Sequence, residues 1–171
     1  MKKTWKPMVA AVLLIACIAA VLTVTMPGCT GPYENTLKNN SRYEQTWDRQ
    51  EIRDYSFEIS WTFDNWPPEA GRETPVTIEV RGGAAQSIKY TDTGSSVPNP
   101  GFYMSVDNLS KLFAVIREMA RLGQGKVTAY YDARYGYPER IDNVYYLGKD
   151  NTEGTVTTSY QVSNFMITES Q

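Results

Sequence analysis

The sequence feature that most constrains the fold is stretch 54–64, in which aromatic or aliphatic residues alternate with polar ones. The apolar set is Tyr55, Phe57, Ile59, Trp61 and Phe63. Successive side chains of a β-strand point to opposite faces, so this alternation puts one face against a core and the other in water. We therefore expect a long strand in a sheet that is covered on one side only.

The rest of the chain carries further helix and strand signals. Ser41 and Glu44 have the spacing of a capping box, and Ser105 can cap a second helix that Gly123 ends. The elements expected after residue 40 are a helix from Ser41, strands 54–64, 76–81 and 86–91, a helix over 105–122, and strands 126–132, 139–147 and 155–162. Hairpin connections between strands favour an α+β fold, an antiparallel sheet of about six strands with one or two helices on one face.

The N-terminus has the pattern of an export signal. Lys2, Lys3 and Lys6 precede an apolar run over 8–26, and Gly28 precedes Cys29. A cysteine at this place is typical of a bacterial lipoprotein, in which the thiol is acylated with palmitate-type chains. The apolar run is also long enough for an uncleaved anchor helix, and simple cleavage and secretion is a third reading. We expect residues 1–28 to be the signal or anchor, 29–40 a tether, and 41–168 a single α+β domain.

Composition excludes several classes of function. The chain has no histidine, and its two cysteines are Cys17, inside the apolar run, and Cys29. Zinc sites, Ser-His-Asp triads and Cys-His pairs are therefore excluded from residues 30–171, and we expect no catalytic residues, metal or cofactor. Residues 1–28 hold three of the 17 lysines and arginines and none of the 19 acidic residues, which leaves a formal net charge of −5 for the remainder. This charge argues against nucleic acid as a partner.

Two stretches of the chain resemble a known family. Residues 47–57 read W-x4-I-x-D-Y-x-F, and residues 131–141 read Y-D-x2-Y-G-Y-P-x2-I. In this order and behind an export signal, they resemble the bacterial lipoprotein family of unknown function DUF6174, over about residues 42–167. The resemblance implies an exported domain and brings no catalytic residues or cofactor.

The tyrosine-rich second stretch is the best candidate for a binding surface. We name Tyr131, Asp132, Arg134, Tyr135 and Tyr137 as its residues. Tyrosine and arginine often anchor recognition surfaces, because they combine a broad contact area with polar tips. A structural alternative stands beside this hypothesis: Gly136 and Pro138 build a turn, Tyr131 and Tyr137 pack its flanks, and Asp132 ties the turn amides.

One short motif suggests a different function. Asp92-Thr93-Gly94-Ser95-Ser96 resembles the active-site turn of pepsin-like aspartic peptidases, and Tyr146-Leu147-Gly148 could serve as the later apolar pair. Lys89 and Thr91 before the aspartate, and the helix over 105–122, fit such a barrel poorly.

The function that the sequence favours is non-catalytic. We expect a lipoprotein held by Cys29 at the cell membrane or envelope, facing the periplasm or the exterior, that binds an envelope protein, a peptide or a cell-wall component. The alternatives are a retropepsin-like peptidase that uses Asp92 and a purely structural envelope protein.

Overall fold

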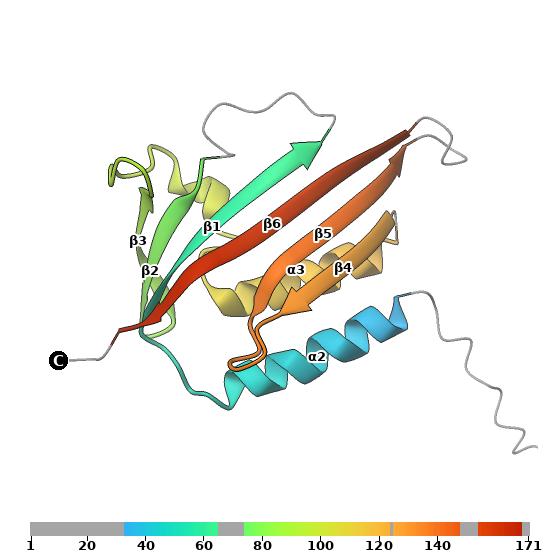
Figure 1. Cartoon of the computed structure of the whole chain (residues 1–171), viewed down its shortest axis with the longest axis horizontal. Coiled ribbons are helices and arrows are strands. Elements are labelled where there is room, and N and C mark those ends of the chain that lie inside the picture. The colour runs from blue at the N-terminus through green and yellow to red at the C-terminus, as the bar shows by residue number, and fades with distance from the viewer. Residues whose placement is uncertain (1–32, 65–73, 124, 148–153, 169–171) are drawn as a thin grey trace, which may run out of the picture. The chain divides into compact units, whose positions relative to one another are not determined.

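A computed structural model describes residues 33–64, 74–123, 125–147 and 154–168 of the chain. The expected strand order is present. The elements in chain order are α2 (Glu34–Asp48), β1 (Tyr55–Asp64), β2 (Val76–Arg81), β3 (Ala84–Tyr90), the short 3-10 helix η1 (Pro100–Tyr103), α3 (Leu109–Leu122), β4 (Gly125–Tyr131), β5 (Pro138–Leu147) and β6 (Gly154–Ile167). The predicted sequence of helix, three strands, helix and three strands is thus confirmed (Figure 1).

The strands form one antiparallel sheet in the order β3-β2-β1-β6-β5-β4. Each half of the chain contributes a run of hairpin-connected strands, and the pairing of β1 with β6 joins the two runs in the middle of the sheet. Their register extends from Tyr55 opposite Ile167 to Asp64 opposite Thr157. The first and last strands of the sequence therefore lie side by side, which short-range sequence patterns do not indicate.

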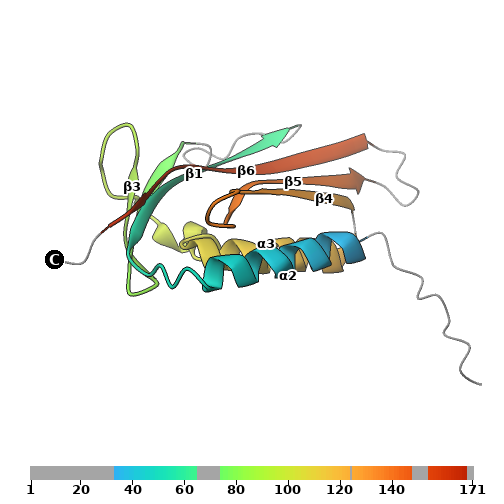
Figure 2. The ribbon, with the colours of Figure 1, turned by 60° about the horizontal axis from the view of Figure 1, so that its bottom comes forward.

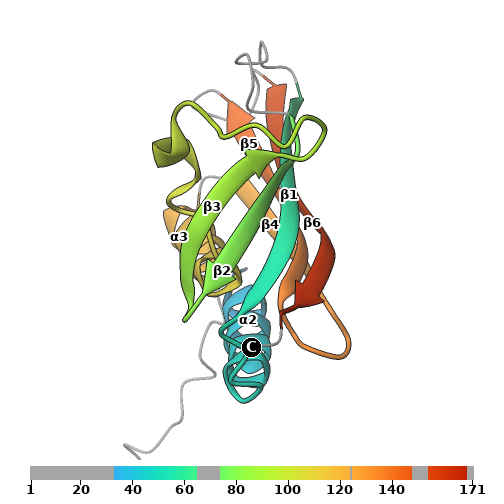
Figure 3. The ribbon, with the colours of Figure 1, turned by 90° about the vertical axis from the view of Figure 1, so that its left-hand side faces the viewer.

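The alternation in β1 defines the inner face of the sheet, as expected. Tyr55, Phe57, Ile59 and Trp61 are buried, while the intervening residues up to Ser60 are partly exposed. Both helices cover this inner face, and within the described ranges no element covers the opposite, open face (Figures 2 and 3). The prediction of helices on one side of the sheet is confirmed.

Helix α3 supplies the apolar layer beneath the sheet. Its Leu109, Leu112, Phe113 and Ile116 are fully buried, because apolar residues recur along it at three- and four-residue spacing. Gly123 adopts the left-handed conformation with φ +63 and ends the helix, as predicted. Helix α2 packs beside α3, and an ion pair between Glu44 and Arg117 joins the two helices.

Both predicted helix starts are corrected by the structure. Helix α2 begins at Glu34 instead of Ser41, so the last residues of the expected tether 29–40 are helical. The reason is tertiary: Asn40 is fully buried and donates from Nδ2 to the Phe113 carbonyl oxygen at 3.0 Å. Helix α3 is capped by Asn108 instead of Ser105, since the Asn108 side chain accepts from the Lys111 N–H.

Several predictions fall outside the described residues. These are the signal or anchor 1–28 and the lipidation site Cys29. Within the part of the chain that the structure describes, no helix is long and apolar enough to span a bilayer.

The domain has two ends with different contents (Figures 1 and 2). At the end that we call the tip, α2 ends, β1 and α3 begin, and the β2–β3 and β4–β5 turns are found on either side of the sheet. At the end that we call the base, α2 and β4 begin, and α3 and β5 end. The predicted tyrosine-rich surface belongs to the tip.

Candidate functional site

The turn between β4 and β5 is organised by Asp132. Its carboxylate oxygen Oδ1 accepts hydrogen bonds from the backbone N–H groups of Arg134, at 2.9 Å, and Tyr135. Its main chain pairs with Tyr137 and Gly136 through hydrogen bonds of 2.9 and 3.0 Å. By satisfying these amides, the Asp132 carboxylate has a structural role in the turn. This is the structural alternative that the sequence predicted for Asp132.

Gly136 lets this turn pack directly on α2. Its φ of +86 lies in the region that favours glycine, and a Cβ here would lie 3.0 Å from Thr46 Cβ and 3.1 Å from the Tyr43 carbonyl oxygen. The turn is therefore held both by its own backbone and by the helix beneath it.

Tyr131 is a packing residue of the same junction. Its ring stacks on Tyr43 with centroids 4.2 Å apart and planes 6° apart, and its hydroxyl donates to Asn40 Oδ1 at 3.1 Å. Burial raises the pKa of the Tyr131 phenol well above its ordinary value, with a further rise from Tyr43 and Glu44. A stacked, partly buried and hydrogen-bonded tyrosine offers little surface to a partner.

Tyr137 joins an aromatic cluster that lies at the tip. The cluster consists of Trp47, Tyr55, Tyr135, Tyr137 and Phe165, in edge or tilted contacts with ring centroids 4.8–6.0 Å apart. Such contacts stabilise a core beyond the apolar area they bury. The two stretches that carry the family resemblance thus meet in space: Trp47 and Tyr55 come from the first, and Tyr135 and Tyr137 from the second.

Tyr55 links this cluster to the start of α3. Its hydroxyl accepts the Leu109 N–H at 3.1 Å, which satisfies one of the free amides at the helix N-terminus. Burial raises the pKa of Tyr55 to about 12, and burial followed by the charge of Asp132 raises the pKa of Tyr137 to about 12. Both rings are therefore neutral over the whole physiological pH range.

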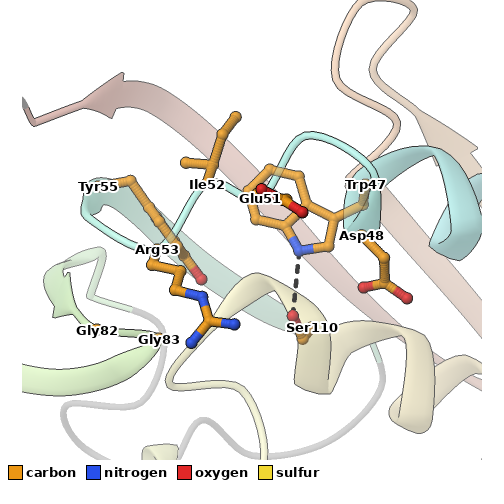
Figure 4. A pocket seen from close by; sticks show the side chains of 9 residues that line it. All are labelled: Trp47, Asp48, Glu51, Ile52, Arg53, Tyr55, Gly82, Gly83 and Ser110. Carbon is orange, nitrogen blue, oxygen red and sulfur yellow. Dashed lines mark hydrogen bonds between the residues drawn. The ribbon is translucent and has the colours of Figure 1, made fainter.

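A cavity of about 330 Å³ opens beside the cluster (Figure 4). Its lining residues are Trp47, Asp48, Glu51, Ile52, Arg53, Tyr55, Gly82, Gly83 and Ser110. Trp47 Nε1 donates to Ser110 Oγ at 3.1 Å, as the dashed line in Figure 4 marks. Glu51 has φ +53 and its N–H donates to the Asp48 carbonyl oxygen, so its left-handed conformation belongs to the end of α2. Asp48 and Glu51 carry negative charges in this lining and Arg53 carries a positive one. The cavity therefore favours neither an anionic nor a cationic ligand.

The exposed part of the tip consists of different residues. Tyr130 is 52% exposed on the open face of the sheet, opposite Arg140 on β5, whose Cζ lies 5.8 Å from the Tyr130 ring centroid. Arg140 Nε also donates to Asp142 Oδ1 at 2.9 Å, and this oxygen accepts from Ser159 Oγ at 2.7 Å. The three strands β4, β5 and β6 therefore present a preformed polar cluster.

Of the five residues predicted to form a binding surface, Arg134 is the one that is exposed at the tip. It is exposed in the turn, and its Cζ lies 4.9 Å from the centroid of the partly buried Tyr135 ring. We call Tyr130, Arg134, Arg140 and Asp142 the tip patch. The surface predicted from the sequence does not include Tyr130, Arg140 or Asp142. The two-residue spacing of Arg140 and Asp142 in β5 was the signal that they share a face.

The aspartic motif lies elsewhere. Asp92 is exposed in the turn after β3, where Thr93 Oγ1 and Ser95 Oγ are hydrogen-bonded at 2.6 Å. In the sheet, β2, β1 and β6 lie between β3 and β5, the strand that carries Tyr146 and Leu147. The structure therefore does not bring these two parts of the motif together within one chain. No group of three or more metal-ligating side chains is found in the described ranges.

Comparison with known proteins supports the resemblance noted in the sequence. The model of a family described as "Family of unknown function (DUF6174)" matches residues 39–166, which is most of the described domain. No curated protein matches the chain.

Proposed function

We propose that this chain, which belongs to the DUF6174 family, is an extracytoplasmic, membrane-anchored lipoprotein that serves as a non-catalytic binding module of the cell envelope. The export signal with Cys29 supports the location, as argued from the sequence. Two acyl chains on one cysteine are sufficient for stable anchoring, whereas one chain gives only reversible binding.

The observation that carries the binding role is the tip patch. Tyr130, Arg134 and Arg140 are exposed, whereas Tyr55 and Tyr137 at the tip are buried. Asp142 holds Arg140 in place, so the guanidinium is oriented before any partner arrives, which lowers the entropy cost of binding. Tyrosine and arginine are the residue types that most often dominate interface energies.

The partner that we propose is an envelope protein, peptide or cell-wall polymer with acidic or hydrogen-bond-accepting groups. Arg134 and Arg140 can each donate to such groups in a planar, bidentate geometry, and Tyr130 supplies an aromatic surface beside Arg140. The remaining surface of the sheet's open face consists mostly of hydroxyl and amide side chains, among them Ser60, Thr62 and Gln161, which suits a wet and polar interface.

The test is site-specific photocrosslinking in the native membrane. Tyr130 is replaced by p-benzoylphenylalanine in the full chain, and Phe102, an aromatic residue that is 49% exposed on η1, is replaced as a matched control. We expect a discrete adduct from position 130 that Arg140→Ala and Arg134→Glu reduce, and none of that mass from position 102. Identical adducts from both positions, or an adduct that neither arginine variant changes, would contradict the proposal.

A further inference from the structure

The chain enters the described domain close to its proposed anchor. Three residues, Thr30, Gly31 and Pro32, separate Cys29 from Tyr33. A chain spans at most 3.3–3.6 Å per residue, so three residues make a short link. The Tyr33 hydroxyl donates to the carbonyl oxygens of Gly125 and, at 3.3 Å, Gly123. This contact fixes the start of the domain to its base.

The base also exposes apolar side chains. Leu122 at the end of α3 is 51% exposed, and Tyr146 and Leu147 at the end of β5 are 43% and 40% exposed. Gly125 pairs with Tyr145, so the end of β5 lies beside the connection that follows Leu122. Leucine and tyrosine together are typical of contacts at the lipid–water interface, where the tyrosine hydroxyl reaches the headgroups.

Charges at the base are mixed. Arg121 and Lys126 are exposed there, and so are Glu34 and Glu118. The two cations can extend towards lipid phosphates along their aliphatic stems. Because exposed acids lie among the cations, a contact with a membrane here depends mainly on the apolar side chains and changes little with salt.

We propose that the base of the domain rests on the bilayer that holds the N-terminal anchor, with Leu122, Tyr146 and Leu147 in contact with the lipid interface. This inference rests on the proposed membrane anchoring. A weak contact suffices, because the short link keeps the local concentration of membrane high. The tip patch then faces away from the bilayer, towards the cell-wall side, where a partner can reach it.

The experiment uses the full chain, acylated in cells and reconstituted into vesicles that contain lipids spin-labelled near the headgroup. In a Cys17→Ser background an introduced cysteine is the one free thiol, since Cys29 carries the lipid. A fluorophore is attached at Leu147→Cys on the base or, as the control, at Gln86→Cys, which is exposed on β3 near the tip. We expect quenching and a blue shift at position 147 and neither at position 86, at low and at high salt.

A second pair of variants separates contact from mere proximity. Leu122→Glu should reduce quenching at position 147, while Ala114→Glu, at an exposed position of the same helix, should leave it unchanged. Equal quenching at positions 147 and 86 in vesicle-bound protein would overturn the inference and leave the anchoring intact. If the protein does not sediment with vesicles at all, both the inference and the proposed anchoring are wrong.

Discussion

The tip and the base of the domain use tyrosine in opposite ways. At the tip, Tyr137 is buried in the aromatic cluster and Tyr131 stacks on Tyr43, with its hydroxyl bound to Asn40. At the base, Tyr146 near the end of β5 is 43% exposed. The difference shows that residue type alone does not mark a surface. What separates the two groups is whether a neighbouring element covers the ring and satisfies the hydroxyl.

The same contrast holds for backbone order. At the tip, Asp132, Gly136 and Tyr55 fix two turns and a helix start through hydrogen bonds and close packing. At the base, the Tyr33 hydroxyl holds the carbonyl oxygens of Gly123 and Gly125, while Leu122, Tyr146 and Leu147 stay 40–51% exposed. The tip should therefore carry much of the stability, and changes at the base should affect location more than folding.

The largest effect is expected from Trp47→Ala at the tip. Trp47 is 4% exposed and contacts three other rings of the cluster, so its removal leaves a cavity. Deleting a buried tryptophan costs about 3–5 kcal/mol of unfolding free energy. Urea-induced unfolding measures this loss. Leu122→Ala at the base is the matched control and should change stability by less than about 0.5 kcal/mol. Equal losses of unfolding free energy for the two variants would show that the tip does not contribute more to stability than the base.

A smaller effect is expected from Gly136→Ala. The left-handed conformation costs a residue with a side chain roughly 1–2 kcal/mol, and the new Cβ would press on Thr46 and the Tyr43 carbonyl oxygen. We expect a loss of about 2–3 kcal/mol in thermal or urea unfolding. Gly94→Ala, with φ +68 and no neighbour within 4 Å, should cost about 1 kcal/mol. If both variants lose the same unfolding free energy, the contact between the turn and α2 does not contribute to stability.

A further effect is expected at alkaline pH. The pKa of Tyr55 and of Tyr137, about 12 in the folded chain, exceeds the ordinary tyrosine value of 10.0. The unfolded chain loses these protons first, so the stabilisation is complete below pH 10 and is lost as the pH rises to about 12. Hydrogen exchange should show the tip opening before the base over this interval. Exchange that accelerates first at the base would contradict this expectation.

Much of the fold was predictable because its signals are local. The alternation of β1, the apolar spacing of α3 and the stop at Gly123 each predict the structure that is found. The start of α2 was not predictable in this way. Its buried residue Asn40 is polar, and the groups that satisfy it, on Phe113 and Tyr131, come from elsewhere in the sequence.

In the candidate site too, the local features were predictable from the sequence and the long-range contacts were not. The role of Asp132 in its turn follows from the local sequence, and the structure agrees. The tip patch was only partly visible, since Arg140 and Asp142 join Tyr130 through the pairing of β4 with β5, and Ser159 joins them through β6.

The sequence by itself determined the strand and helix types, the one-sided sheet, the absence of histidine and the family, because periodicity and composition are properties of the chain alone. Only the tertiary structure decided that β6 pairs with β1, that Trp47 meets Tyr137, and which tyrosines stay exposed. Pairing and burial depend on contacts between residues far apart in the sequence, and no local pattern specifies them.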